Sequence, residues 1–214
     1  MTEEAAEESA SLSPRGRGSG RGLSFKLLII TDWSRGDCVE TIREALRAGP
    51  GIAIQHRHPG ATDRQLYEEG LRLKAACGDA PLFINGRLDL ALALDAHLHL
   101  TGRSLSPADV RPHLGSRWLS ASCHPPAAAP EGVDLLLVSP VFDPISKPAD
   151  RAPLGVEAFH AFARSTPTPC FALGGITAER VQVLRPLAGV AAIGEVMHAA
   201  SPARAAEALL RALG

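Results

Sequence analysis

The chain has 214 residues, of which 45% are hydrophobic, and its formal net charge is -1. This length is enough for a sizeable core, and the balanced charge gives no electrostatic basis for binding nucleic acid or an anionic membrane surface. No apolar run approaches the roughly 18 residues that a membrane span needs. We therefore expect a soluble, cytoplasmic protein without nucleic-acid or membrane partners.

The N-terminal segment differs in composition from the rest of the chain. Residues 1–24 contain four Glu residues and then the run RGRGSGRG, and they hold almost nothing that could enter a core. This composition predicts a disordered tail over residues 1–24. The segment lacks the apolar stretch of a secretory signal, and its early acidic residues argue against a mitochondrial transit peptide.

From residue 25 onward, short apolar runs alternate with stretches rich in Ala, Leu and Arg. The runs are almost continuously apolar, which is typical of parallel strands that are covered on both faces. Ser-Pro pairs or closing glycines mark several of the intervening helices. The expected strands are residues 26–31, 51–57, 81–85, 96–100, 117–124, 133–141, 169–176 and 189–196, and the expected helices are 34–49, 63–78, 106–115 and 201–214.

Two further stretches complete the pattern. Residues 87–94 place Leu at every second position, as a strand would, but their Ala and Leu content without β-branched residues favours a helix. Residues 125–132 contain too many prolines for a good helix, so the fifth crossover is expected to be short or irregular. Eight alternating units predict a single-domain (β/α)8 TIM barrel over residues 25–214, with a doubly wound open sheet as the alternative.

In such a barrel the chemistry takes place at the C-terminal ends of the strands. The seventh strand ends at Gly174 and Gly175, and the eighth ends near Ile193 and Gly194. Glycine lets the backbone approach a ligand closely, and successive N–H groups form an anion-binding nest. Because phosphate sites in this fold commonly use these two loops, we expect the four residues to bind a phosphate.

Polar side chains at other strand ends suggest a substrate site. Gln55 and Arg57 lie two residues apart, so they share one face of the second strand, and Arg57 offers a planar fork for a carboxylate or phosphate. His56 and His58 are expected to face the helix layer or to leave the strand. Asn85 ends the third strand.

The fifth and sixth strands end in residues suited to proton transfer and anion binding. His124 ends the fifth strand with Ser122 two residues before it, and an imidazole that titrates near neutrality can act as a general acid and base. Lys147 lies in the proline-rich loop after the sixth strand, where it could close over an anionic ligand as a lid.

The sequence gives little reason to expect a metal site built from histidine or cysteine. His97 and His99 share a face, but no third ligand has diagnostic spacing. The four cysteines are widely spaced and form no Cys-x-x-Cys pair, which suits a reducing compartment.

The motifs LLIITD, IQHRH, INGRLDLALAL, HLHL, SASCH, VSPVFDPISKP, FALGGIT and AAIGEVM, in this order, resemble the family of thiamine phosphate synthase and thiazole tautomerase. The resemblance covers nearly everything from Leu27 to the C-terminus. It implies a (β/α)8 barrel that handles the phosphorylated thiazole half of thiamine. In this family the synthase joins that half to a pyrimidine diphosphate with Mg²⁺, whereas the tautomerase aromatises a thiazole carboxylate phosphate by proton transfer without metal.

The chain departs from the synthase pattern at three places. The synthase motif Gln-x-Arg-x-Lys has Pro59 in place of its lysine in this chain. The synthase pair Asn-Asp is replaced by Asn85-Gly86. The Gly-Gln and acidic residues that follow the fourth strand are replaced by residues 101–104, TGRS. Mg²⁺ needs oxygen ligands, usually carboxylates, so these changes weaken the synthase interpretation. In a synthase, Asp32, Asp143 or Asp150 would have to supply the missing ligands.

The resulting hypothesis is a metal-independent thiazole tautomerase without cofactor, acting on a small-molecule thiazole phosphate. The alternatives are a Mg²⁺-dependent thiamine phosphate synthase and a catalytically inactive protein that binds a thiazole or thiamine phosphate. Homo-oligomer formation stays open. The predicted roles are catalysis for His124 and Arg57, substrate binding for Gln55, Asn85, Ser122 and Lys147, and phosphate binding for Gly174, Gly175, Ile193 and Gly194.

Overall fold

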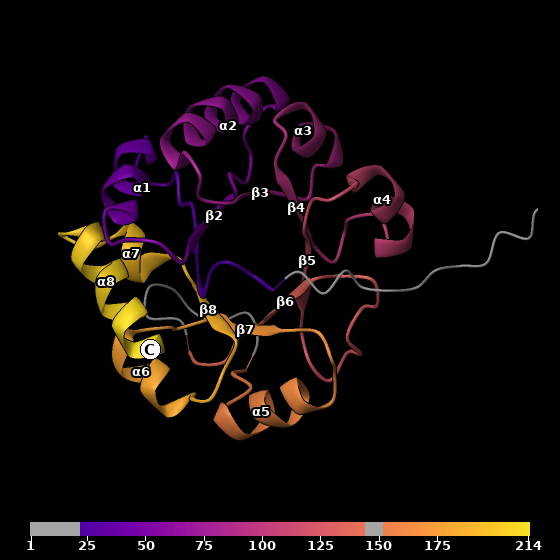
Figure 1. Ribbon diagram of the computed structural model, residues 1–214, viewed down its shortest axis with the longest axis vertical. Coiled ribbons are helices and arrows are strands. Elements are labelled where there is room, and N and C mark those ends of the chain that lie inside the picture. The colour runs from indigo at the N-terminus through magenta and orange to yellow at the C-terminus, as the bar shows by residue number, and fades with distance from the viewer. Residues whose placement is uncertain (1–21, 144–151) are drawn as a thin grey trace, which may run out of the picture.

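The computed structural model describes residues 22–143 and 152–214, and in them eight parallel strands close into one barrel. The strands follow one another around the barrel in chain order, and β1 pairs with both β2 and β8. Figure 1 shows the helices arranged around this ring. The TIM barrel is therefore confirmed and the open sheet was the wrong alternative. Lys147, Asp150 and most of the predicted tail lie outside the described residues.

All eight expected strands are present, but most are shorter than the apolar runs suggested. The predicted strand 189–196 is too long, because Ile193 leaves the strand conformation with φ -119° and ψ -89° and a short helix follows. The strands are β1 Leu27–Ile30, β2 Ile52–His56, β3 Leu82–Asn85, β4 His97–Leu100, β5 Leu119–Cys123, β6 Leu135–Val138, β7 Cys170–Ala172 and β8 Gly189–Ala192.

The five helices expected from the sequence are also present, and the described residues form three more. Ser106 and Ser201 cap their helices as predicted, because each side chain accepts a hydrogen bond from a backbone N–H of the first turn. The predicted helices are α1 Val39–Leu46, α2 Asp63–Cys77, α3 Leu88–Ala93, α4 Pro107–Leu114 and α8 Pro202–Leu213; the sequence did not indicate α5 Val156–Arg164, α6 Ala178–Val183 or α7 Gly194–Met197.

The crossover from β5 to β6 has no helix, as the prolines of residues 125–132 predicted. Figure 1 shows this as a stretch of irregular chain on the outside of the barrel between α4 and α5. His124, which begins this crossover, is therefore positioned by irregular backbone instead of a helix.

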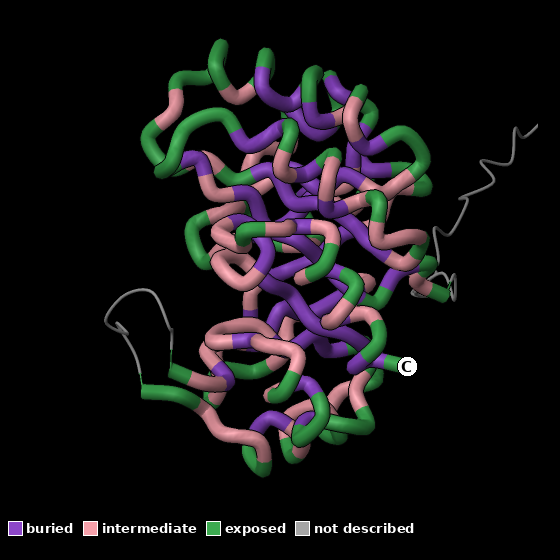
Figure 2. The backbone as a smooth tube through the Cα atoms, turned by 90° about the vertical axis from the view of Figure 1, so that its left-hand side faces the viewer, coloured by how far each residue is buried: buried purple, intermediate pink, exposed green. Residues whose placement is uncertain are grey.

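Two apolar clusters form the core, and the strands lie between them. Alternate strand residues such as Leu27 and Ile29 point outward and pack under the helices, whereas Leu28 and Ile30 point into the barrel. Figure 2 shows the buried backbone concentrated in the middle of the molecule, with exposed segments at its periphery. Each strand is thus buried on both faces, which explains its nearly continuous apolar sequence.

Aromatic side chains close the barrel interior at the N-terminal ends of the strands. The ring of Phe25 packs edge-on against Phe83, Trp118 and Phe171, with centroid distances of 5.8, 5.7 and 5.6 Å. We call these four residues the aromatic plug. Toward the C-terminal ends, the interior instead holds polar side chains such as Gln55 and His99.

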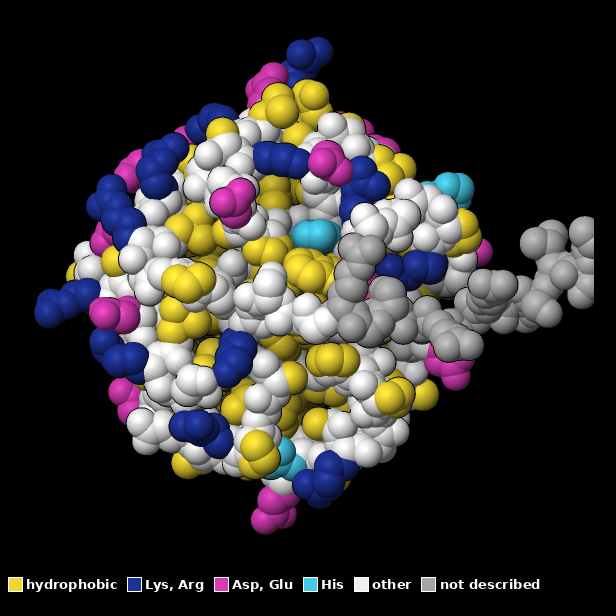
Figure 3. Space-filling view, viewed as in Figure 1, with side chains coloured by type: hydrophobic (Ala, Val, Ile, Leu, Met, Phe, Trp, Pro, Cys, Tyr) yellow, Lys and Arg dark blue, Asp and Glu magenta, His cyan; other side chains and the backbone are white. Residues whose placement is uncertain are grey.

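On the molecular face seen in Figure 3, basic and acidic side chains are interspersed around the rim and do not gather in one patch of a single sign. This distribution agrees with the balanced net charge of -1. Within residues 22–143 and 152–214, no helix is long and apolar enough to cross a membrane.

Gly189 provides a test of how tightly the aromatic plug is packed. A Cβ atom at this position would lie 2.4 Å from the carbonyl oxygen of Lys26 and 2.4 Å from the ring of Phe171. We expect Gly189→Ala to lower the free energy of unfolding by about 1–3 kcal/mol, because the backbone and the ring must both move. Urea denaturation measures the change. Gly102→Ala is the control, since a Cβ there meets nothing within 4 Å; equal stability of both variants would contradict the tight packing.

His99 predicts a loss of stability in acid. Burial, and to a lesser degree Arg57, lowers the pKa of His99 to about 3, whereas an unfolded histidine titrates near 6.5. The unfolded chain therefore binds more protons, and stability falls as the pH drops below about 6.5, by at most about 1.4 kcal/mol per pH unit from this residue. We expect His99→Gln to show a smaller difference in unfolding free energy between pH 7.0 and 5.5. An unchanged difference would assign the acid sensitivity to other groups.

Candidate functional site

A cavity of about 570 Å³ opens at the C-terminal ends of β2 to β5. It brings together five residues that the sequence analysis predicted as site residues. Its lining also includes residues that the sequence analysis did not predict, such as His99 and Arg87. The predicted residues in its lining are Gln55, Arg57, Asn85, Ser122 and Ile193. Their roles stay predictions, but their convergence on one space follows from the barrel, which directs all strand ends to the same rim.

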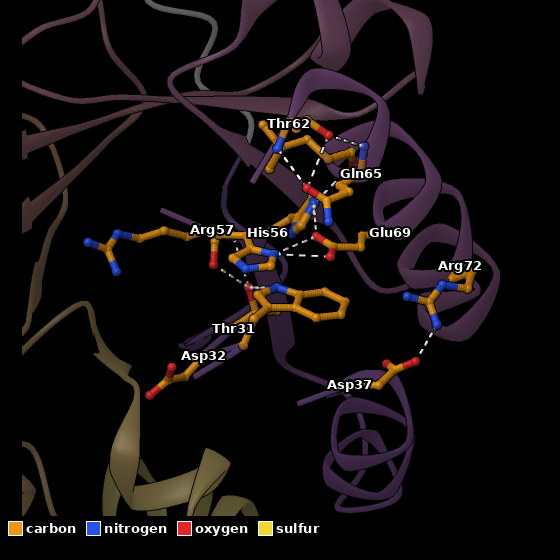
Figure 4. Close-up of polar contacts among 12 residues, drawn as sticks. Thr31, Asp32, Asp37, His56, Arg57, Thr62, Gln65, Glu69 and Arg72 are labelled. Carbon is orange, nitrogen blue, oxygen red and sulfur yellow. Dashed lines mark hydrogen bonds and ion pairs between the residues drawn. The ribbon is translucent and has the colours of Figure 1, made fainter. Parts of the chain in front are cut away.

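Gln55 in β2 and Arg57 directly after this strand both line the cavity, so the two side chains lie on one face, as their spacing predicted. Gln55 is only 1% exposed, and its Nε2 has no hydrogen-bond acceptor among the described residues. The backbone of Arg57 is fixed by Thr31, whose Oγ1 accepts from the Arg57 N–H at 2.9 Å and donates to the Arg57 carbonyl at 3.1 Å. Figure 4 shows the side chain of Arg57 extending away from the polar contacts around His56 and Glu69.

His56 and His58 interact with helix α2, as the alternation along β2 predicted. The His56 Nε2 lies 3.1 Å from the carbonyl oxygen of Leu66, so this nitrogen carries the proton, and burial lowers the pKa of His56. The His58 Nδ1 lies 3.0 Å from both carboxylate oxygens of Glu69, and the His58 ring stacks on Trp33. These contacts fix the wall of the cavity nearest α2 (Figure 4).

His99 lies between two serines inside the barrel. Its Nδ1 is 2.9 Å from Ser120 Oγ and its Nε2 is 2.9 Å from Ser122 Oγ. Because its pKa is lowered to about 3, the ring is neutral near pH 7, so it donates to one hydroxyl and accepts from the other. The ring therefore orients the Ser122 hydroxyl at the cavity wall. The Nδ1 of His97 instead accepts a hydrogen bond from the backbone N–H of Trp118 at 3.0 Å, so the two histidines of the His-x-His pair have separate hydrogen-bonding functions.

His124 lies beside a different space from Gln55 and Arg57. Its Nδ1 is 2.7 Å from the carbonyl oxygen of Ser139, and a carbonyl can only accept, so Nδ1 carries the proton. In the neutral ring Nε2 is then unprotonated and can accept a proton from a ligand. His124 and Ser139 line a second cavity of about 270 Å³, together with Pro140 and Leu154. His124 is not part of the lining of the larger cavity.

The glycine pair after β7 has a packing role that the sequence did not reveal. Gly174 and Gly175 have φ angles of +99° and +60°, and a Cβ on Gly174 would lie 2.8 Å from the Cα of Pro140. A Cβ on Gly175 would lie 2.4 Å from the carbonyl oxygen of Asp143. The pair thus lets the start of the loop after β6 pack against β7. Neither glycine nor Gly194 lines either cavity, so the predicted phosphate nest stays a prediction.

Among the described residues, no carboxylate contributes to the lining of the larger cavity. Asp32 is held by the Ser34 N–H at 3.0 Å and by His198 Nε2 at 2.9 Å; burial alone would raise the pKa of Asp32, but these contacts lower it. Within the described ranges, no three His, Cys, Asp or Glu residues are grouped so that they could hold a metal ion. The donors described at the strand ends therefore do not fit Mg²⁺.

Comparison with known proteins gives a consistent picture. A family model described as thiamine monophosphate synthase matches residues 27–196. A thiamine-phosphate synthase of Chloroflexus aurantiacus is 33% identical over 201 residues, covering 89% of this chain and 93% of the relative. One from Prochlorococcus marinus strain MIT 9313 is 36% identical over 194 residues, covering 86% of this chain but 54% of the relative, so the chain spans about half of that protein.

Solved structures agree with this result. The thiamine phosphate pyrophosphorylase of Pyrococcus furiosus has 29% sequence identity and a TM-score of 0.77, over 88% of this chain and 95% of that chain. A 3-hexulose-6-phosphate synthase has a TM-score of 0.62 at 14% identity, a likeness that extends to the fold alone. The family model covers most of the barrel, and the chain therefore belongs to the thiamine monophosphate synthase family.

Proposed function

We propose that this enzyme of thiamine biosynthesis joins a thiazole phosphate to a pyrimidine diphosphate and releases diphosphate. The names of the relatives support this synthase activity, which the sequence analysis held only as the alternative. The tautomerase hypothesis receives no support from them. In the proposed reaction the thiazole nitrogen forms a bond to the pyrimidine methylene carbon, while the bond from that carbon to the diphosphate oxygen breaks and its electron pair leaves with the diphosphate.

One observation carries the proposal: among the described residues, the lining of the 570 Å³ cavity contains Arg57 and Arg103, which have no acidic partner, together with the paired Arg87, and it contains no carboxylate. The leaving diphosphate gains negative charge as its bond to carbon breaks, and preformed positive charge stabilises that change. Arg57 offers a planar fork of N–H donors, and the buried Gln55 Nε2 offers one more. The hydroxyl of Ser122 and the amide of Asn85 then remain to orient the heterocycle.

The phosphate of the thiazole is assigned to the loops after β7 and β8. The backbone N–H groups around Gly174, Gly175, Ile193 and Gly194 are the proposed donors; Lys147, also predicted to bind substrate, lies outside the described residues. Support comes from the position of Ile193, which lines the larger cavity and thus connects these loops with Gln55 and Arg57.

The family resemblance implies Mg²⁺ for a synthase, where the ion would neutralise the diphosphate. The described residues offer no matching set of carboxylates and so do not fit the ion. Asp32 is engaged by His198, and Asp150 lies outside the described residues.

The test is to incubate the full-length protein with the thiazole phosphate and the pyrimidine diphosphate, with excess Mg²⁺ and separately with EDTA. Thiamine phosphate is quantified by oxidation to its fluorescent thiochrome. Product that scales with enzyme concentration supports the synthase. Absence of product under both conditions, with the thiazole phosphate bound in a titration, would instead favour the non-catalytic binding protein or the tautomerase.

A second candidate, the thiazole tautomerase, is favoured by His124. The hydrogen bond from its Nδ1 to the Ser139 carbonyl leaves Nε2 as a base at a strand end, which is what a proton transfer needs. An NMR time course of the non-aromatic thiazole carboxylate phosphate with protein and EDTA tests this activity. Only aromatisation faster than the protein-free background supports it.

His124→Gln separates the two reactions. We expect the rate of aromatisation to fall about 10²–10⁴-fold if His124 moves the proton, because general acid–base catalysis contributes this much. The synthase reaction requires no proton transfer by this side chain, so its kcat is expected to change by less than about tenfold. A large loss of synthase kcat with intact folding, monitored by circular dichroism, would contradict this division of roles.

Arg57→Ala tests the assignment of the diphosphate. We expect kcat/KM for thiamine phosphate formation to fall about 10²–10³-fold, the usual effect of removing one preorganised donor for developing charge. Arg57→Lys is expected to restore only part of the rate, because an ammonium lacks the planar fork. Arg35→Ala removes an exposed arginine outside the cavity and serves as the control. Full activity of Arg57→Ala would remove Arg57 from the site.

A further inference from the structure

The three arginines of the 570 Å³ cavity are not equivalent. Arg87 is already neutralised: its Nε lies 2.9 Å from Asp89 Oδ1, its Nη2 lies 2.7 Å from Asp89 Oδ2, and its Nη1 contacts Asp63. These hydrogen bonds raise the pKa of Arg87 and hold its side chain at the junction of α2 and α3. The positive charge of Arg87 is therefore balanced by carboxylates of the protein itself.

The charges of Arg57 and Arg103 are not paired in this way. Among the described residues, neither guanidinium group takes part in an ion pair or a side-chain hydrogen bond. Arg57 follows β2, whereas Arg103 lies in the turn between β4 and α4, and both line the same cavity. Two like charges beside one cavity, whose described lining contains no carboxylate, create a potential that attracts an anion.

The turn that carries Arg103 is fixed by its own hydrogen bonds. The Thr101 N–H donates to Ser104 Oγ at 3.0 Å, the Ser104 N–H donates to the Thr101 carbonyl at 3.0 Å, and the Arg103 N–H donates to Thr101 Oγ1 at 3.3 Å. The backbone of Arg57 is fixed by Thr31 in a similar way. Both arginines thus extend from constrained backbone, which lowers the entropy cost of holding a ligand between them.

Gln55 supplies an independent sign of a ligand. Its side chain is buried at 1% exposure and lines the same cavity, and its Nε2 has no acceptor among the described residues. A buried donor without a partner is unfavourable, so this position is expected to be occupied by an acceptor oxygen when the site is loaded. An oxyanion provides that acceptor and the negative charge together.

We propose that Arg103 acts with Arg57 and Gln55 to bind a diphosphate group without a divalent cation. The two guanidinium groups supply the positive charge, and the Gln55 amide supplies a neutral hydrogen bond. The inference rests on the proposed function for the identity of the anion, but not for its binding. Arg103 is thereby a ligand-binding residue. A site that binds no cation needs no carboxylate ligands, which explains why none is found among the described lining residues.

The experiment is isothermal titration of the full-length protein with inorganic pyrophosphate in EDTA, and again with Mg²⁺. We expect pyrophosphate to bind in EDTA. Arg103→Gln is expected to weaken this binding at least about tenfold, the effect of losing one charge-assisted hydrogen bond, and Arg103→Lys to weaken it less. Arg35→Gln, which removes an exposed charge after β1 and outside the cavity, is expected to bind like the unmodified protein.

Two results would overturn the inference: pyrophosphate binding that requires Mg²⁺, or binding in EDTA that Arg103→Gln leaves unchanged. Either can occur in a protein that makes thiamine phosphate, so the inference can fail while the proposed function stands. Conversely, pyrophosphate binding in EDTA that depends on Arg103, in a protein that makes no thiamine phosphate, would uphold the anion site and reject the synthase. Unfolding curves of each variant establish that the fold is intact.

Discussion

The closure of the sheet is the constraint on which the rest of this structure depends. Once β1 pairs with both β2 and β8, every second strand residue must point into one narrow interior, which has to be filled without voids. The aromatic plug around Phe25 fills it at one end, and Gly189 leaves room for the ring of Phe171. The other end then needs no apolar filling and can hold hydrogen-bonding side chains. Packing at the bottom of the barrel thus makes a polar cavity at the top feasible.

Much of this architecture could be predicted from the sequence, because each strand is buried on both faces and so appears as an apolar run. The run length overestimated the strands, however, since apolar residues such as Ile193 continue past the last ladder hydrogen bond to line the cavity. The missed helices have weaker sequence signals. Helix α5 begins at Val156 after Gly155, an N-cap residue that provides no side-chain cap, and α6 and α7 have only six and four residues. Their helical state is determined by packing on the barrel more than by local sequence.

Some features of the candidate site could likewise be predicted from local sequence, whereas others depend on contacts between distant residues. The convergence of Gln55 and Arg57 could be predicted, because residues two apart on a strand share a face. The hydrogen-bond partners of His99 could not be predicted, because they come from the neighbouring strand β5. They depend on the register between β4 and β5, which places His99 opposite Ser120. The spacing of Ser120 and Ser122 carried a signal in retrospect, because two hydroxyls on one face of a barrel strand need a partner inside. The sequence also could not reveal that the segment from Pro140 to Asp143 requires glycines at 174 and 175.

The distribution of charge links the fold to the chemistry. Residues around the rim supply carboxylates as well as cations, and four of these carboxylates have a protein partner: Asp63 and Asp89 hold Arg87, Glu69 holds His58, and Asp32 holds His198. This pairing stabilises the rim and removes negative charge from the cavity. The remaining arginines then face a space where a polyanion meets attraction without competing acids. His124 lies apart, beside its own smaller cavity, and so keeps an imidazole base away from that positive potential. One rim therefore holds two separate spaces, a larger one lined by arginines and a smaller one beside His124, and the two proposed reactions call on different ones.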